Sequence, residues 1–183
     1  MILYHGTRLV SAQDIVTNGI TLSKGKKSVD FGRGFYTTPS LVFARKCANW
    51  KCDYDISQAG IVEITLSDDV YARLNVREFT GPSRAWAQYI INNRNGLQYV
   101  TSVGERDYNL FPPKYDISIG LTADDEIFEL ARRLRRHRRV LSDIEYEEIE
   151  KGAYKYIQCA FHTSISIELL KLRLMEKEEW QNE

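Results

Sequence analysis

The chain has 183 residues, of which 43% are hydrophobic and 27% are charged. A chain of this length buries roughly 70% of its unfolded surface, so it can build a hydrophobic core without disulfides or bound metal ions. The composition excludes a disordered or collagen-like class. Lysine plus arginine number 25, as do aspartate plus glutamate, so no net charge draws the whole protein to nucleic acid or to a membrane.

The N-terminal stretch MILYHGTRLV carries a charge at Arg8, and no long apolar run follows it. This pattern fits neither a secretory signal nor a membrane anchor, so we expect a cytoplasmic protein without membrane association. A toxin exported by a specialised machine would show the same pattern. Cys47, Cys52 and Cys159 are odd in number and lack Cys-x-x-Cys spacing. We therefore expect neither a disulfide framework nor a zinc site.

In the first half of the chain, strands are expected at runs of β-branched or apolar residues and helices after side chains that can cap a first turn. The expected elements are a strand over 2–5, a helix from Ser11 (with Asp14) to Asn18-Gly19, a helix from the cap Ser40 to about Trp50, a strand over 61–66, and a helix from the cap Ser83 through Asn92.

The second half follows the same pattern. Its expected elements are a strand over 115–120, a helix opened by a capping box of Thr122 and Asp125, a capping box of Ser142 and Glu145, and a strand over 154–163. Residues 165–175 suit strand or helix equally. Strands interspersed with single helices, without regular βαβ alternation, predict a mixed α+β fold. Because no linker or internal repeat divides the sequence, we expect residues 1–183 to form one domain.

Two motifs place polar and aromatic groups beside exposed backbone. Tyr4-His5-Gly6-Thr7 ends the first strand and presents a ring, a glycine backbone and a hydroxyl. Residues 30–38, DFGRGFYTT, combine Gly32 and Gly34 with Phe35-Tyr36. Taken singly, a strand-end histidine with a local hydrogen bond and a Gly-rich hairpin with core-facing aromatics explain them. A ligand-binding alternative is a backbone approached closely by a planar heterocycle that stacks on Tyr36, an interaction on the order of 1–3 kcal/mol.

Together and in order, the motifs resemble the ADP-ribosyltransferase superfamily, in particular the branch of diphtheria toxin and the poly-ADP-ribose polymerases. That branch has a His-Gly-Ser/Thr strand, a Gly-x-Gly-φ-Tyr turn before a helix, and a late strand bearing a glutamate. His5-Gly6-Thr7 matches the first element and residues 32–36 the second. The late strand matches in its alternation, but the glutamate position holds Gln158. The pattern, with Asn93-Arg94 and Ala123-Asp124-Asp125, looks most like a bacterial subfamily of the superfamily.

The resemblance implies an ADP-ribosyltransferase-like split β-sandwich, with two small sheets around a cleft for NAD as co-substrate. By the same resemblance His5 holds a ribose hydroxyl, the Gly6 backbone holds the nicotinamide amide, and Tyr36 stacks on the ring. A second aromatic is usual in the following helix, but the aligned position holds Cys47, which leaves Phe43 or Trp50. The implied cofactor-binding set is His5, Gly6, Thr7, Arg33, Gly34, Tyr36 and Phe43.

The expected chemistry is cleavage of the nicotinamide glycosidic bond through an oxocarbenium-like cation. Gln158 can hydrogen-bond the ribose 2′-hydroxyl but supplies no charge, and a charge pair about 4 Å apart at an effective dielectric near 20 interacts by about 4 kcal/mol, roughly a thousandfold in rate. Asp124 and Asp125 are the candidates for a displaced carboxylate. Both also suit the first turn of a helix, where acids face the helix dipole favourably.

These features predict a mono-ADP-ribosyltransferase that modifies a macromolecule, protein or nucleic acid, as a bacterial toxin or effector with an antitoxin or immunity partner. Two alternatives remain: an NAD glycohydrolase, and a non-catalytic module that binds NAD, ADP-ribose or nucleic acid. The arginine-rich stretch 131–140 and the acidic stretch 143–150 either pair with each other or leave the arginines as a docking patch for the acceptor.

Overall fold

The computed structural model describes residues 1–67, 70–95, 109, 112–123, 125–137, 141–151 and 154–181. The described strands are β1 (Ile2–Arg8), β2 (Phe35–Thr37), β3 (Ala59–Leu66), β4 (Val76–Glu78), β5 (Ile117–Leu121), β6 (Ile157–Phe161) and β7 (Leu170–Leu174). The described helices are α1 (Leu9–Asn18), α2 (Leu41–Lys51), α3 (Val70–Arg73), α4 (Arg84–Asn95), α5 (Asp125–His137), α6 (Asp143–Glu150), α7 (Ser164–Glu168) and α8 (Glu178–Gln181), with short 3₁₀ turns η1 (Leu22–Lys24) and η2 (Ile56–Gln58).

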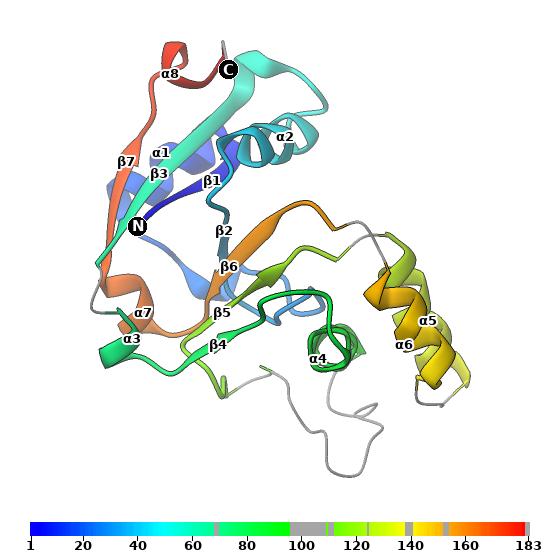
Figure 1. Cartoon of the computed structure of the whole chain (residues 1–183). Coiled ribbons are helices and arrows are strands. Elements are labelled where there is room, and N and C mark those ends of the chain that lie inside the picture. The colour runs from blue at the N-terminus through cyan, green and yellow to red at the C-terminus, as the bar shows by residue number, and fades with distance from the viewer. Residues whose placement is uncertain are drawn as a thin grey trace.

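The strands form two small sheets, which confirms the expected α+β class (Figure 1). The first has the order β1-β3-β7 and is antiparallel throughout. The second has the order β2-β6-β5-β4, in which only β4 and β5 are parallel. The two sheets meet where Tyr4 of β1 exchanges backbone hydrogen bonds with Thr38, just after β2, at 2.8 and 2.9 Å.

A shared hydrophobic core holds the sheets together. Leu3 and Val62 from the first sheet pack in one buried cluster with Ile117 and Phe161 from the second. The second sheet covers another core on its opposite side, where Trp86 and Ile90 of α4 join residues from α5 and α6. Figure 1 shows α4 beneath the second sheet and α5 and α6 together at one end of it. The second sheet therefore packs against a hydrophobic core on each of its faces, and one of these cores it shares with the first sheet.

Helix α2 lies unusually close to β1 because β1 carries a glycine at the contact. A Cβ on Gly6 would lie 1.7 Å from the Ala44 carbonyl oxygen and 2.9 Å from the Ala48 nitrogen, both in the α2 backbone. Ala44 and Ala48 are themselves small and fully buried at this contact. Three residues without bulk thus let the helix backbone approach the strand, and this approach brings the C-terminal end of α2 to the cleft.

Most helix starts follow the predicted caps. Ser40 accepts a hydrogen bond from the Phe43 N–H at 3.2 Å, Ser83 accepts one from Trp86 at 3.2 Å, and Ser142 forms the full capping box with Glu145. α2 ends at Lys51, and α4 runs three residues past the expected Asn92. Local capping chemistry was sufficient at these positions.

Two predicted helix starts are wrong. The first helix begins at Leu9 rather than Ser11, directly from β1, because α1 packs over Gly60 of β3, where a Cβ would lie 2.8 Å from the Leu9 Cα. It does end at Asn18-Gly19 as expected. α5 begins at Asp125, and Thr122 does not cap it; the Ala123 N–H instead donates to the Asp30 carboxylate at 3.1 Å. Tertiary contacts decide both starts.

The strand expected over 115–120 begins two residues late, at Ile117, and the one over 154–163 is confined to Ile157–Phe161. The segment 165–175 contains both structures, since α7 ends at Glu168 and β7 follows from Leu170. None of the helices in the described ranges has the length and apolarity needed to cross a bilayer.

Candidate functional site

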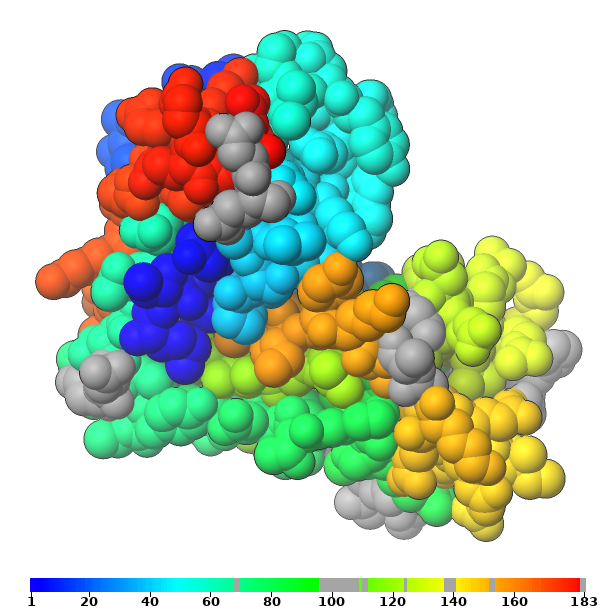
Figure 2. Space-filling view, turned by 45° about the horizontal axis from the view of Figure 1, so that its top comes forward, coloured from blue at the N-terminus to red at the C-terminus, as the bar shows by residue number. Residues whose placement is uncertain are grey.

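Two adjoining hollows lie where the sheets and α2 meet. The smaller hollow has a volume of about 220 Å³, and the larger hollow about 450 Å³. They share His5, Tyr36 and Lys51 as lining residues. Together they form the cleft, whose volume falls in the range of about 300–1,000 Å³ usual for small-molecule sites. In Figure 2, α2 in light blue lies directly against β6 in orange, at the edge of this cleft.

Residues from five parts of the chain converge on the smaller hollow. The lining residues are Tyr4, His5 and Gly6 from β1, Tyr36, Thr37 and Thr38 from β2 and the residue after it, Phe43, Ala44, Cys47 and Lys51 from α2, and Thr122 with Gln158 from the second sheet. Of the residues singled out in the sequence, the structure brings together His5, Gly6, Tyr36, Phe43 and Gln158 here. Thr7 and Gly34 line the larger hollow.

The ring of His5 is fixed in one orientation and one tautomer. Its Nδ1 lies 2.5 Å from the Tyr36 carbonyl oxygen; since a carbonyl only accepts, Nδ1 carries the hydrogen and Nε2 remains an acceptor. Burial, reinforced by the nearby charge of Lys51, lowers the pKa of His5 to about 3. At neutral pH His5 is therefore an uncharged ring whose Nε2 can accept a hydrogen bond from a hydroxyl.

The backbone of Gly6 faces the cleft. Tyr4 turns its N–H and C=O away from β3 toward Thr38, and in a strand the residue two positions on faces the same way. The Gly6 carbonyl accepts a hydrogen bond from Lys51 Nζ at 2.8 Å, and a carbonyl oxygen has a second lone pair. The N–H and C=O of Gly6 form an edge that suits a carboxamide. Its lack of a side chain also serves the packing of α2.

Two aromatic rings border the smaller hollow. The Tyr36 hydroxyl donates to the Gly32 carbonyl at 2.7 Å and accepts from the Phe31 N–H at 3.0 Å, and burial raises its pKa well above 10.0. Phe43 lines the hollow and stacks on Tyr156, with ring centroids 4.3 Å apart and planes 9° apart. Trp50 is 53% exposed and does not line the hollow, so of the two alternatives left open by the sequence, Phe43 lies at the cleft.

Gln158 is held by a buried carboxylate that the sequence analysis did not select. Its Nε2 donates to Asp30 Oδ2 at 2.7 Å, and Asp30 also accepts from Arg94 Nε at 2.7 Å. Asp30 and Gln158 are only 5% and 7% exposed. Because the amide nitrogen must face the carboxylate, Oε1 is the Gln158 atom left for a ligand. A glutamate at this position would put two carboxylates in contact, which strongly disfavours ionisation of both.

Thr122 contributes a hydroxyl to the same wall. Its Oγ1 is buried and has no hydrogen-bond partner among the described residues, while its N–H is held by the Tyr156 carbonyl at 2.8 Å. Buried hydroxyls are ordinarily paired, because leaving one unpaired costs about 1–3 kcal/mol. A ligand hydroxyl or amide in the smaller hollow would satisfy it. Because Thr122 does not cap α5, its hydroxyl is available to a ligand in the cleft.

The glycines of the 30–38 loop are required by close packing. Gly32 has φ of 82°, and a Cβ there would lie 2.3 Å from the Asn109 carbonyl oxygen. A Cβ on Gly34 would lie 2.7 Å from the Phe161 carbonyl oxygen. Arg33 lies between them but lines neither hollow; its carbonyl accepts from His162 Nδ1 at 2.8 Å, and its Nε is buried without a partner among the described residues.

The larger hollow carries the charged groups that sequence reasoning missed. Lys51 lines both hollows, and Lys24 and Lys26 line the larger one. One sequence signal could have indicated that Lys51 lines the cleft. It lies four residues after Cys47, on the same face of the helix that begins after Ser40. In the described ranges no group of three or more His, Cys, Asp or Glu side chains is placed to hold a metal ion.

One comparison with known proteins gives a match. Residues 1–172 match a family model described as "Protein of unknown function (DUF3990)". The chain belongs to this family. Among the curated proteins and the solved structures compared, none matches. The family match covers every residue that lines the cleft and all strands except the last two residues of β7, so the cleft lies within the region that the family model describes.

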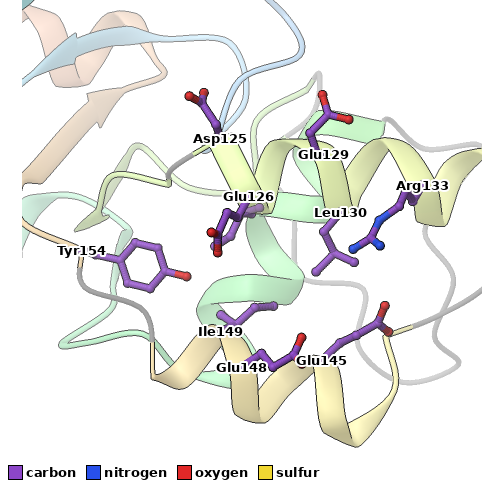
Figure 3. Close-up of a pocket in the computed structure, with 10 residues that line it drawn as sticks. Asp125, Glu126, Glu129, Leu130, Arg133, Glu145, Glu148, Ile149 and Tyr154 are labelled. Atoms are coloured by element: carbon purple, nitrogen blue, oxygen red, sulfur yellow. The ribbon is translucent and has the colours of Figure 1, made fainter.

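A third hollow, of about 410 Å³, lies between α5 and α6 and is called the helix hollow (Figure 3). Carboxylates dominate its lining: Asp125, Glu126 and Glu129 from α5, Glu145 and Glu148 from α6, together with Ile127, Leu130, Arg133, Ile149 and Tyr154. Figure 3 shows Asp125 at the start of α5 pointing away from α6. Asp125 is exposed and does not line the cleft; Asp124 lies outside the described residues.

The described arginines of the stretch 131–140 lie on an exposed face of α5. Arg132 pairs with Glu129 of its own helix at 2.8 Å, and Asp143 of α6 pairs with Arg84 of α4 at 3.0 Å. Arg133 shares the helix hollow with Glu145 and Glu148. The two alternatives for the basic stretch, pairing with 143–150 or docking an acceptor, both stay open.

Proposed function

We propose that the protein binds NAD in the cleft and transfers its ADP-ribose to a macromolecular acceptor, on an ADP-ribosyltransferase-like arrangement of the two sheets. The observation that carries the proposal is the convergence of His5, Gly6, Tyr36, Phe43 and Gln158 on one hollow of about 220 Å³. This volume is below the usual range for a whole ligand and suits one ring with its ribose. The order of the motifs along the chain supports the same reading.

In this proposal the nicotinamide ring lies between Tyr36 and Phe43, with its carboxamide on the N–H and C=O of Gly6. Stacking on the two rings contributes about 1–3 kcal/mol. His5 Nε2 accepts from a ribose hydroxyl, as its fixed tautomer allows. Gln158 Oε1 and the Thr122 hydroxyl are the remaining polar atoms beside the sugar.

The reaction breaks the bond between the nicotinamide nitrogen and ribose C1′, and nicotinamide leaves with the electron pair. A nucleophilic atom of the acceptor then bonds to C1′ and loses its proton. The oxygens of Gln158 and Thr122 offer partial negative charge to the cation between these steps. The negative charge of Asp30 is neutralised by its ion pair with Arg94. We therefore expect turnover to be up to about a thousandfold slower than it would be in a cleft with a free carboxylate beside the cation.

One observation favours a second candidate, a module that binds NAD or ADP-ribose without cleaving it. None of the described residues that line the smaller hollow is a carboxylate. Binding needs only the ring, hydroxyl and backbone contacts, whereas cleavage also needs stabilisation of the cation. Hydrolysis by water in place of the acceptor would make the protein an NAD glycohydrolase.

The test is incubation of the purified protein with labelled NAD and a cell lysate. Nicotinamide release and the label on protein and nucleic acid are measured separately. His5→Ala and Gln158→Ala are the loss-of-site variants, and Lys27→Gln is the matched surface control, because Lys27 is exposed and lines neither hollow. Label that disappears in His5→Ala but persists in Lys27→Gln supports the transferase and identifies the acceptor class.

Nicotinamide release without label would instead identify a glycohydrolase. NAD binding without either product would leave the non-catalytic module, and absence of NAD binding would overturn the proposal. This assay tests the class of acceptor. An antitoxin or immunity partner, a role as toxin or effector, and a cytoplasmic location stay predictions.

A further inference from the structure

Lysines surround the larger hollow. Lys24 comes from η1, Lys26 from the loop after it, and Lys51 from the end of α2. One carboxylate, Asp14, also lines the hollow, and it is already paired with Lys24 at 2.9 Å. The described lining therefore keeps two positive charges, those of Lys26 and Lys51, beyond its internal ion pair. A hollow with this balance attracts an anion.

Lys51 is held in place at the junction of the two hollows. Its Nζ donates to the Gly6 carbonyl at 2.8 Å, and its own carbonyl accepts from Arg8 Nε at 2.8 Å. The ammonium has three hydrogens, so two stay available to a ligand. Burial of the ammonium, with a smaller contribution from the charge of Lys26, lowers the pKa of Lys51. A bound anion at this point would offset both the desolvation of the Lys51 ammonium and its repulsion by Lys26.

The remaining lining of the larger hollow suits a nucleoside. Thr7, Ser11 and Thr21 supply hydroxyls, while Ile15, Ile20 and Val29 supply apolar surface. The smaller hollow, on the other side of Lys51, has the aromatic rings and the carboxamide edge. A dinucleotide has the same order of parts: a ring with its ribose, a diphosphate, and a second nucleoside.

Resting on the proposed function, we propose that Lys51, assisted by Lys26, binds the diphosphate of the dinucleotide at the junction of the two hollows. The nicotinamide ribose then occupies the smaller hollow, and the adenosine occupies the larger one. Lys51 contributes to affinity for any ligand that carries the diphosphate. Its effect on recognition of the nicotinamide ring is small, because it takes up only one lone pair of the Gly6 carbonyl and leaves the other to the carboxamide.

Isothermal titration calorimetry with ADP-ribose, inorganic pyrophosphate and nicotinamide tests this assignment on the full chain. Lys51→Gln should weaken binding of ADP-ribose and pyrophosphate about tenfold or more and change the affinity for nicotinamide by no more than about twofold. Lys26→Gln should weaken binding of the first two ligands less. Lys51→Arg keeps the charge and should retain most of the affinity. Lys27→Gln is the control for loss of a surface charge, and melting temperatures confirm that the variants fold.

ADP-ribose affinity that stays within about twofold of the wild type in Lys51→Gln would overturn the inference, as would a wild-type protein that binds neither ADP-ribose nor pyrophosphate. Equal weakening by Lys27→Gln would also overturn it, since the effect would then be general electrostatics. Diphosphate binding through Lys51 without nicotinamide binding would contradict the proposed function but support this diphosphate site. Nicotinamide release that Lys51→Gln does not change, measured at low NAD concentration, would contradict this diphosphate site but support the proposed function.

Discussion

The larger hollow of the cleft and the helix hollow offer similar space but opposite chemistry. The larger hollow of the cleft measures about 450 Å³ and the helix hollow about 410 Å³. The cleft is lined by a neutral histidine, a backbone edge, hydroxyls and lysines. The strand β1 and a hydrogen bond to Tyr36 fix the histidine ring. The helix hollow is lined mainly by carboxylates, some on exposed positions of two helices.

The difference shows why volume alone does not identify a site. An exposed carboxylate on a helix is stabilised by water whether or not a ligand is present, so it says little about function. A buried polar group must find a partner. Asp30 and Gln158 meet that demand by pairing with each other, whereas Thr122 Oγ1, which has no partner among the described residues, points to a ligand. The following predictions test this contrast.

The largest effect is expected from Asp30→Ala. It removes the buried partner of Arg94 and of Gln158, and loss of one partner of a buried ion pair costs about 3–5 kcal/mol. Asp143→Ala is the matched control, because it also removes the carboxylate partner of an arginine of α4, Arg84, but the Asp143 side chain is 85% exposed. This substitution should cost about 0–1 kcal/mol of stability. Urea unfolding at neutral pH measures both. Equal losses would mean that burial at Asp30 adds nothing.

Gly6→Ala should follow in size. Its Cβ would collide with the Ala44 carbonyl, so α2 must shift, at about 1–3 kcal/mol or more. Gly81→Ala is the control, since a Cβ there meets nothing within 4 Å, and its effect should be within about 1 kcal/mol. Thermal melting compares the two. A Gly6→Ala variant that melts with the wild type would contradict the packing of α2 on β1.

Acid should destabilise the folded protein through two histidines that the fold holds neutral, His162 and His5, of which His5 lines the cleft. Burial lowers the pKa of His162 from 6.5 to about 4 and that of His5 to about 3, so the unfolded chain takes up these protons first. The stability that the protein gains from holding these rings neutral is fully present above pH 6.5. It is lost as the pH falls from 6.5 toward the lowered pKa values of the folded protein. At pH 5 the loss for His162, which is 6% exposed, is about 2 kcal/mol.

Unfolding free energies at pH 7.5 and pH 5 measure this loss. A His162→Gln variant, if it folds, should show a smaller pH dependence than the wild type over the same interval. A wild-type protein that is equally stable at both values would show that the histidines are not held neutral.

The smallest effects are expected in the helix hollow. Asp125→Asn removes an exposed acid from the first turn of α5, which costs about 0.3–1 kcal/mol through the helix dipole. Glu148→Gln should change stability by no more than about 0.5 kcal/mol. Neither should alter nicotinamide release by more than about twofold, because neither residue lines the cleft. A large loss of release in Asp125→Asn at unchanged stability would restore it as the displaced carboxylate.

Sequence reasoning located much of the cleft because its parts are coded locally. His5-Gly6-Thr7 and Gly34-Phe35-Tyr36 carry their backbone edge and rings within a few residues, and the Ser40 cap fixes the helix that brings Phe43. It missed Asp30 and Lys51. Asp30 is the first residue of the motif DFGRGFYTT, but it pairs with Gln158, which is 128 positions away in the chain, and no local pattern encodes that pairing.

The sequence by itself determined the α+β class, the helix caps at Ser40, Ser83 and Ser142, and the order of the cleft motifs, because capping and strand patterning depend on neighbours within a turn or two. Tertiary structure alone decided that Gln158 rests on Asp30, that Thr122 leaves its hydroxyl to the cleft instead of capping α5, and that Lys51 reaches the Gly6 carbonyl. These depend on how closely α2 and the two sheets pack, and packing joins residues far apart in the chain.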